Sequence, residues 1–298
     1  MKKLFLTLCV LLTIAGCSSS PQTVDELKTQ INNKLKSLEG DFAVVFINLS
    51  DTTQKVFINE HEMFHAASTM KTPVMIELFK QANLGKFVLS DSILIKNEFY
   101  SIVDSSLYKM DINEDSEGKL YELIGQKSTI RQLMEDMITS SSNLATNILI
   151  QKVGAQNVTR TMRSYGADSI LVLRGVEDIK AYRKGLSNRT TALDEAIIYK
   201  RIATGNAVNE QASQAMIEIL KQQEFNEMIP ARLPNNIEVA HKTGWITGVN
   251  HDAGIVILPD GKKYVLVLLS KNAPYRENVQ AAFAGISRDV YSFVVNDE

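Results

Sequence analysis

The sequence is poor in cysteine, proline and tryptophan, with two, six and one among its 298 residues. Its only cysteines are Cys9 and Cys17, so the body of the chain can form neither a disulfide framework nor a cysteine-based zinc site, and it has no thiol nucleophile. The chain also lacks a large excess of either charge, since it contains 32 Lys and Arg and 34 Asp and Glu residues. With no basic run, we expect no nucleic-acid partner. The composition, 45% hydrophobic and 22% charged, instead predicts a folded chain with a packed core.

Long hydrophobic runs are scarce too, and the clearest one lies at the start of the chain. Residues 4–14 are mostly apolar and follow two lysines. A membrane-spanning helix needs about 20 apolar residues, so this shorter run is typical of an export signal. The segment Ile14-Ala15-Gly16-Cys17 resembles the lipobox of bacterial lipoproteins, in which the cysteine carries the lipid. Cleavage as an ordinary secretory peptide is the alternative.

These features predict how the N-terminus is processed. We expect a signal peptide over residues 1–16, lipidation at Cys17 and a serine-rich tether over 17–23. The protein would then be exported and anchored to a membrane by its lipid, in the periplasm or cell envelope. Residues 24–298 would form one domain, and no apolar stripe demands a partner, so we expect a monomer.

Hydrophobic periodicity predicts strands near both ends of that domain and helices between them. Helical spacing is found over 24–38, from Ser68 to about residue 83, and over 277–295, whereas strands are expected at 42–49, 55–58, 238–246, 253–258 and 264–269. We therefore expect an α+β fold with one five-stranded antiparallel sheet, flanked by the terminal helices. The α/β part would comprise 24–85 and 228–298, and an all-helical subdomain, 86–227, would be inserted into it.

A zinc motif is present but poorly placed. Residues 61–65 read H-E-x-x-H, and Asn97-Glu98 could supply a third ligand. Zinc binding requires both histidines on one face of a stable helix. This segment instead follows a strand and precedes a separate helix start, without an apolar stripe around it. We interpret it as a polar connection and predict no metal.

A second motif begins three residues later. Ser68-Thr69-Met70-Lys71 is S-x-x-K, which places a hydroxyl and an ammonium one helical turn apart. Ser106 and Ser116 also precede a lysine by three residues, so the spacing alone is weak evidence. Ser68, however, opens an apolar helix, where unpaired backbone N–H groups and the helix dipole favour a developing oxyanion.

Two further motifs follow in series. Ser141-Ser142-Asn143 is S-x-N in a break between helical patterns, and Lys242-Thr243-Gly244 is K-T-G on a predicted strand. Each has an ordinary explanation on its own, a helix cap and a strand end. Together with S-x-x-K, on a helix start, a subdomain loop and a strand, they form a much stronger signal.

With these motifs the sequence resembles the class A β-lactamase-like serine hydrolases over about residues 24–298. The resemblance implies that Ser68 is the acylated nucleophile and that Lys71 activates it. It implies that Ser141 relays a proton to the leaving nitrogen. It further implies a substrate-binding set formed by Asn143, Lys242, Thr243, Gly244 and Trp245, with the N–H groups of Ser68 and Trp245 as the oxyanion hole. No cofactor is implied.

The pattern departs from the family in two places. Ser142 stands where these lactamases usually carry aspartate. Glu177 lies at about the right distance before Asn188-Arg189-Thr190-Thr191 to be the deacylating glutamate, but Ala181 stands where an asparagine would help it. A loop ion pair of Glu177 with Arg174 or Arg189 is the alternative.

The expected function is therefore an active-site serine hydrolase that opens the β-lactam amide through an acyl-enzyme. A D-Ala-D-Ala peptidase acting on peptidoglycan peptides, or a slow penicillin-binding lipoprotein, is the first alternative. A non-catalytic binding lipoprotein is the second.

Overall fold

The computed structural model describes residues 21–296, so the predicted signal peptide and Cys17 lie outside the described residues. Its centre is a five-stranded antiparallel sheet in the order β2-β1-β11-β10-β9. The strands are β1 (Asp41–Asn48), β2 (Lys55–Ile58), β9 (Glu238–Ile246), β10 (Val249–Ile257) and β11 (Lys263–Lys271). The predicted sheet, built from both ends of the chain, is confirmed.

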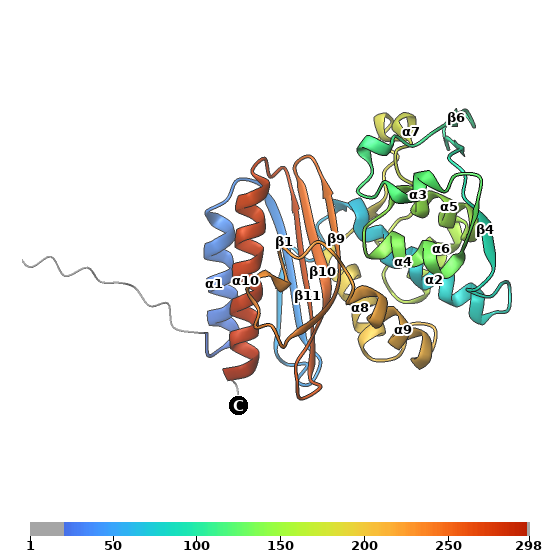
Figure 1. Cartoon of the computed structure of the whole chain (residues 1–298). Coiled ribbons are helices and arrows are strands. Elements are labelled where there is room, and N and C mark those ends of the chain that lie inside the picture. The colour runs from blue at the N-terminus through green and yellow to red at the C-terminus, as the bar shows by residue number, and fades with distance from the viewer. Residues whose placement is uncertain (1–20, 297–298) are drawn as a thin grey trace, which may run out of the picture.

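Both faces of the sheet are buried because its strands alternate apolar side chains to either side. On β1, Val44 and Phe46 face the core beneath α1 (Val24–Lys36) and α10 (Arg276–Asn296), and Phe283 of α10 packs there. Ala43 and Val45 face the opposite core, shared with the helical subdomain. Figure 1 shows α1 and α10 side by side on one face, with α8 and the other helices beyond the opposite face.

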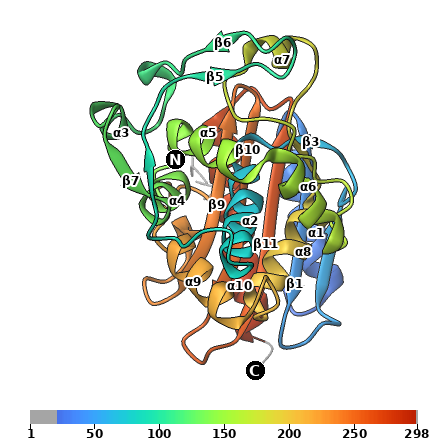
Figure 2. The same ribbon diagram turned by 90° about the vertical axis from the view of Figure 1, so that its right-hand side faces the viewer.

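The central helix of the second core is α2 (Lys71–Asn83), in which nearly every residue is buried. Figure 2 shows it in front of the sheet and surrounded by other helices. Those helices are α3 (Lys119–Glu122), α4 (Ile130–Ile138), α5 (Asn143–Val153), α6 (Ala155–Ser164), α7 (Ile179–Arg183), α8 (Ala192–Ala203) and α9 (Glu210–Leu220). Because α2 contacts α5 and α6 and continues from the turn Ala67–Met70, which packs against β9 and β10, it connects the helical subdomain to the α/β part.

Three short strand pairs supplement this frame. They are β3 (Phe64–His65) with β8 (Arg189–Thr190), β4 (Ser92–Leu94) with β7 (Lys127–Thr129), and β5 (Phe99–Tyr100) with β6 (Leu107–Tyr108). The helical subdomain thus contains a few extended residues besides its helices. The β3–β8 pair matters most for the site, because it joins the approach to Ser68 with the segment that follows Glu177.

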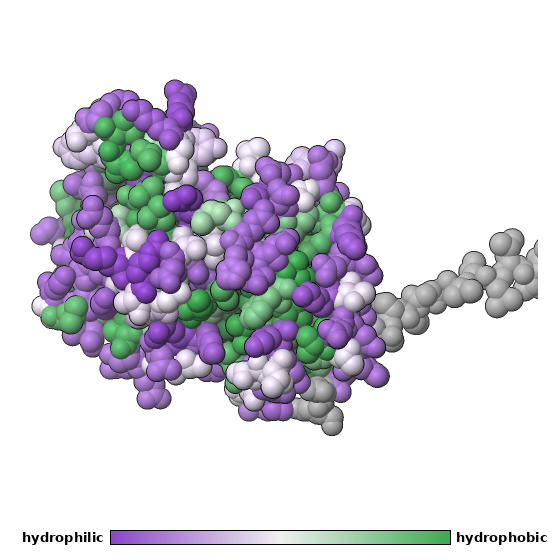
Figure 3. All heavy atoms as spheres, turned by 180° about the vertical axis from the view of Figure 1, so that it is seen from behind, coloured by the Kyte–Doolittle hydropathy of each residue, from purple (hydrophilic) through white to green (hydrophobic). Residues whose placement is uncertain are grey.

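The molecular surface is mixed. Among residues 21–296, no helix combines the length and the apolar composition needed to cross a bilayer. Exposed apolar side chains gather near β5, β6 and α7, including Tyr100, Leu107 and Tyr182. In Figure 3 hydrophobic atoms are visible at that end of the helical subdomain, at the upper left.

Candidate active site

Ser68 lies on a short 3-10 turn, Ala67–Met70, that runs directly into α2. Its neighbours Ala67 and Thr69 are buried, whereas Ser68 itself is only partly covered. The turn is packed against β9 and β10. The predicted nucleophile is therefore presented at the boundary between the sheet and the helical subdomain.

Lys71, the first residue of α2, is completely buried. Its Nζ donates to the carbonyl oxygen of Ser141 at 2.6 Å, to Ser141 Oγ at 3.1 Å and to Asn143 Oδ1 at 2.9 Å. Burial lowers the pKa of Lys71 to about 7, against the opposing charges of Asp115 and Glu177. A substantial fraction of this amine is thus unprotonated near neutral pH, as a general base requires.

The S-x-N motif forms the turn into α5. Ser141 has a left-handed backbone, with φ at 61°, and Ser142 caps the helix by accepting the N–H of Ala145. Asn143 is the first residue of α5, with its amide oxygen towards Lys71. This turn therefore brings Ser141, the predicted proton relay, and Asn143, which is predicted to hold the substrate amide, to the ammonium group of Lys71.

The K-T-G motif lies on β9, at the edge of the sheet. A Cβ atom added to Gly244 would be 3.1 Å from Ser68 N and 3.2 Å from Thr69 N, so only glycine lets the strand come this close to the nucleophile turn. Lys242 is completely buried, and its Nζ donates to the carbonyl of Thr243 at 3.0 Å. Burial and the like charge of Lys71 lower the pKa of Lys242 well below its usual value. The two lysines therefore share one site.

Trp245, the next residue on β9, is 53% exposed. The guanidinium of Arg276 lies over its ring, 4.6 Å from the centroid. This pair borders the site on the solvent side. Arg276 is a feature that the sequence motifs do not contain.

Glu177 is brought to the same place by a loop of the helical subdomain. Its Oε1 accepts from Asn143 Nδ2 at 3.1 Å and its Oε2 from the N–H of Asp111 at 3.3 Å. Its backbone is left-handed, with φ at 60°, and burial raises the pKa of its carboxyl. Arg174 is not its partner, since the guanidinium donates to the carbonyls of Leu186 and Gly175. Asn143 thus hydrogen-bonds to both Lys71 and Glu177. It supplies Glu177 with a side-chain amide, whereas Ala181, which is fully buried elsewhere in the loop, has none to offer.

All predicted site residues except Cys17 therefore converge where the turn before α2, the start of α5, strand β9 and the Glu177 loop meet. The profile of the Beta-lactamase enzyme family matches residues 26–294. The chain belongs to the Beta-lactamase enzyme family.

Individual relatives are distant but cover most of the chain. "Beta-lactamase VEB-1" of Pseudomonas aeruginosa is 22% identical over 93% of each chain, and "Beta-lactamase" of Bacteroides uniformis is 23% identical over 98% of this chain and 99% of its own. Among solved structures, the TLA-3 extended-spectrum β-lactamase has a TM-score of 0.79 at 19% identity, covering 92% of this chain and 100% of its own. A mutant of PBP-A, described as an acyl-enzyme complex with penicillin-G, has a TM-score of 0.77 at 24% identity, covering 93% of this chain and 99% of its own.

In this member of the β-lactamase family, S-x-N has no carboxylate of its own, and a carboxylate from another segment contacts the start of α5. Asp115 accepts the N–H groups of Asn143 and Leu144, at 2.8 and 2.9 Å, and the hydroxyl of Tyr121 at 3.0 Å. It therefore holds the first turn of α5, where a negative charge is favoured by the helix dipole. Ser116 adds a bond from its Oγ to the Ser141 carbonyl. The sequence marks these residues only as part of an acidic connection.

The H-E-x-x-H segment is not a helix. His61 lies in a turn and is exposed, whereas His65 lies on β3. Their imidazoles therefore lack the one-face arrangement that zinc binding requires. Within residues 21–296, no group of three or more His, Cys, Asp or Glu side chains is arranged to hold a metal ion.

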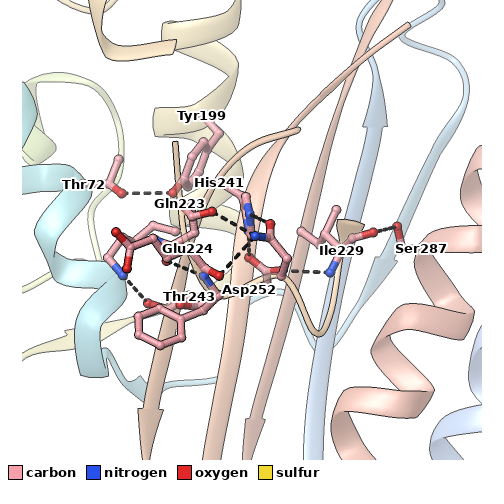
Figure 4. A network of polar contacts seen from close by, with 12 residues as sticks. Thr72, Tyr199, Gln223, Glu224, Ile229, His241, Thr243, Asp252 and Ser287 are labelled. Carbon is pink, nitrogen blue, oxygen red and sulfur yellow. Dashed lines mark hydrogen bonds and ion pairs between the residues drawn. The ribbon is translucent and has the colours of Figure 1, made fainter. Parts of the chain in front are cut away.

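A buried polar network supports β9 from behind. Asp252 of β10 contacts His241 Nδ1 at 2.8 Å and accepts the N–H of Ile229 at 2.9 Å. Ser287 of α10 in turn donates to the Ile229 carbonyl (Figure 4). The residue before Lys242 is thus tied through a neighbouring strand to the opposite layer, which restrains the K-T-G strand.

Proposed function

We propose that the protein is a serine β-lactamase that opens the β-lactam amide through an acyl-enzyme at Ser68. The observation that carries this is the buried amine of Lys71, one turn from Ser68, with a pKa of about 7 and bonds to Ser141 and Asn143. A serine hydroxyl is a poor nucleophile until a neighbouring base removes its proton. Family membership and the arrangement of the three motifs support the same reaction.

Acylation uses this arrangement directly. Lys71 takes the proton of Ser68 as Oγ adds to the β-lactam carbonyl, and the N–H groups of Ser68 and Trp245 stabilise the resulting oxyanion. One such donor is worth about 10²–10³ in rate. The C–N bond of the ring then breaks, and the nitrogen receives a proton through Ser141, which already contacts Lys71 Nζ.

Substrate binding is assigned to β9 and α5. Lys242 and Thr243 would bind the substrate carboxylate, and Asn143 would hold its amide. An arriving carboxylate raises the pKa of Lys242 again, because an opposite charge favours the protonated amine. Binding of the anionic substrate would thereby oppose the lowering of the Lys242 pKa by burial.

Deacylation is assigned to Glu177. Its partly buried carboxyl, with a raised pKa, would take a proton from the water that attacks the ester. Asn143 Nδ2 is hydrogen-bonded to Glu177, so the amide that would hold the substrate is also the one that contacts the proposed base. Turnover is therefore expected to be slower than acylation.

The test is to incubate the domain lacking residues 1–20 with a chromogenic cephalosporin and, separately, with a fluorescent penicillin. Rapid colour supports a β-lactamase, provided that Ser68→Ala abolishes it. Stable labelling of Ser68 without colour would favour the second candidate, a D-Ala-D-Ala peptidase or slow penicillin-binding protein. The buried Ala181 in place of asparagine is the observation that keeps this candidate open. If neither colour nor labelling of Ser68 is observed, the remaining candidate is a non-catalytic binding protein.

We further propose that the protein is an exported lipoprotein, with signal peptide 1–16 and the lipid on Cys17. The support is the lipobox-like sequence before that residue. Expression with a labelled fatty acid should mark the wild-type chain and the Cys9→Ser control. Cys17→Ser should lose the label and be recovered in the soluble fraction. A Cys17→Ser chain that keeps its label would contradict the proposal.

A further inference from the structure

His65, three residues before the nucleophile, makes a contact that the proposed reaction does not use. Its Nδ1 accepts the backbone N–H of Ala67 at 3.0 Å. Ala67 immediately precedes Ser68, so this hydrogen bond restrains the residue directly before the nucleophile. The residue belongs to the H-E-x-x-H segment, whose zinc interpretation the backbone does not support.

Ala67 is where the chain needs such support. Its φ is 45°, in the left-handed region that costs free energy for any residue with a Cβ atom. Two nearby N–H groups have other acceptors, since Ala66 donates to the Asn188 carbonyl at 2.9 Å and Thr69 to the Ala66 carbonyl at 3.1 Å. The bond to His65 is thus the contact that holds the strained residue itself.

Other contacts hold the backbone and the ring of His65. Nε2 of His251, on β10, lies 2.8 Å from the backbone carbonyl oxygen of His65. The ring of Tyr182, from α7 in the Glu177 loop, meets the imidazole edge to face at 6.1 Å. On β3, His65 is paired with Arg189 of β8. The acceptor atom is therefore held by the sheet and by the Glu177 loop together.

The contact requires a neutral ring with its proton on Nε2, because a protonated Nδ1 would face another donor. Burial, aided by the charge of Arg174, lowers the pKa of His65 to about 4. The other titratable groups around it are Arg189, Tyr182 and His251, with the Lys271–Glu62 ion pair near β3. At neutral pH the ring is accordingly an acceptor.

We propose that His65 is a positioning residue, whose Nδ1 holds Ala67 in its left-handed conformation and thereby places Ser68 for attack. This role deepens the proposed function and rests on the acylation of Ser68. His65 acts through Ala67 and does not touch the substrate.

The test compares three substitutions by the rate constant of Ser68 labelling with a fluorescent penicillin. An asparagine side chain can present Oδ1 close to the position of Nδ1, whereas glutamine carries its oxygen one bond further and leucine has no acceptor. We expect His65→Asn to label within about threefold of wild type, and His65→Gln and His65→Leu to label at least about tenfold more slowly. His61→Leu, at the exposed histidine of the same segment, is the matched control and should label normally.

The outcomes separate this inference from the proposed function. If wild type is not labelled at all, the acylation proposal fails first. If wild type is labelled and His65→Leu is folded and labelled equally fast, or if His65→Asn is as slow as His65→Leu, the positioning role is wrong.

Nitrogen NMR of the wild-type protein provides a measurement that needs no variant. The chain has only four histidines, and His65 should show an unprotonated Nδ1 and a protonated Nε2 at pH 7. A protonated Nδ1 would overturn the proposal whatever the variants do.

Discussion

Glu195 on α8 offers a sharp test of the electrostatics beneath the active site. The side chain is buried, and its Oε1 accepts the hydroxyl of Thr190 at 2.9 Å. Burial raises the pKa of its carboxyl from 4.5 to about 7, in spite of the hydrogen bond from Thr190 and the nearby hydroxyl of Thr69, while neighbouring Asp194 adds to the rise. The folded protein therefore prefers the protonated acid.

The sign of the pH dependence follows from that preference. A carboxyl whose pKa is higher in the folded than in the unfolded chain contributes stability below its unfolded pKa, and loses it as the pH rises through its folded pKa. Here that window runs from 4.5 to about 7. At 1.36 kcal/mol per pKa unit, the loss is about 3 kcal/mol. This is a large share of the roughly 5–15 kcal/mol that stabilises a typical domain.

Glu195→Gln removes this dependence because the amide mimics the protonated acid at every pH. We expect the variant to match wild type near pH 4.5 and to be more stable by about 3 kcal/mol above pH 8. Urea unfolding between pH 4.5 and 9 measures the difference, and Glu39→Gln, at an exposed position, is the control. A difference that stays constant over this range would refute the reasoning.

Three further predictions concern the site. The pH profile of the acylation rate should have a limb near the Lys71 pKa of about 7. Asp115→Asn should shift this limb to lower pH, because Asp115 raises that pKa. The same substitution should cost about 1 kcal/mol in unfolding free energy. An unmoved limb would show that Lys71 does not titrate in this step. Glu177→Gln should keep fast labelling of Ser68 but slow release of the acyl group by about 10² or more, which mass spectrometry detects as accumulated adduct; unchanged turnover would remove Glu177 from the mechanism. Gly244→Ala should slow acylation by about 10², because its Cβ would be 3.1 Å from Ser68 N in the proposed oxyanion hole, with labelling kinetics as the measurement. Normal kinetics would mean that β9 can move aside.

Much of the fold could be predicted because its signals are local. The continuous apolar run of β1 and the helical periodicity of α1 indicate which residues are buried, and the predicted strand at 55–58 agrees with β2. The prediction of 253–258 was too short, since β10 begins at Val249. The residues after Val249, which are Asn250, His251 and Asp252, are polar yet buried, so they carry no hydrophobic signal.

The family could be predicted for a related reason. S-x-x-K, S-x-N and K-T-G each place reacting groups within a few residues, so the spacing itself encodes local geometry. The prediction of a class A-like β-lactamase family is confirmed by the match over residues 26–294. The individual catalytic roles remain predictions, although the structure places Lys71 against Ser141 and Asn143.

The sequence by itself thus determined the approximate positions of the five sheet strands and the terminal helices, and it pointed to candidate reacting groups, because hydrophobic periodicity and short motifs act over neighbouring residues. Only the tertiary structure decided how those groups are held. Asp115 reaches Asn143 across 28 positions and Asn143 reaches Glu177 across 34, and no local pattern marks either contact. The structure also shows that His65, a residue of the H-E-x-x-H motif, accepts the backbone N–H of Ala67. Burial, which sets the pKa of Lys71, His65 and Glu195, depends on what the rest of the chain packs around each side chain.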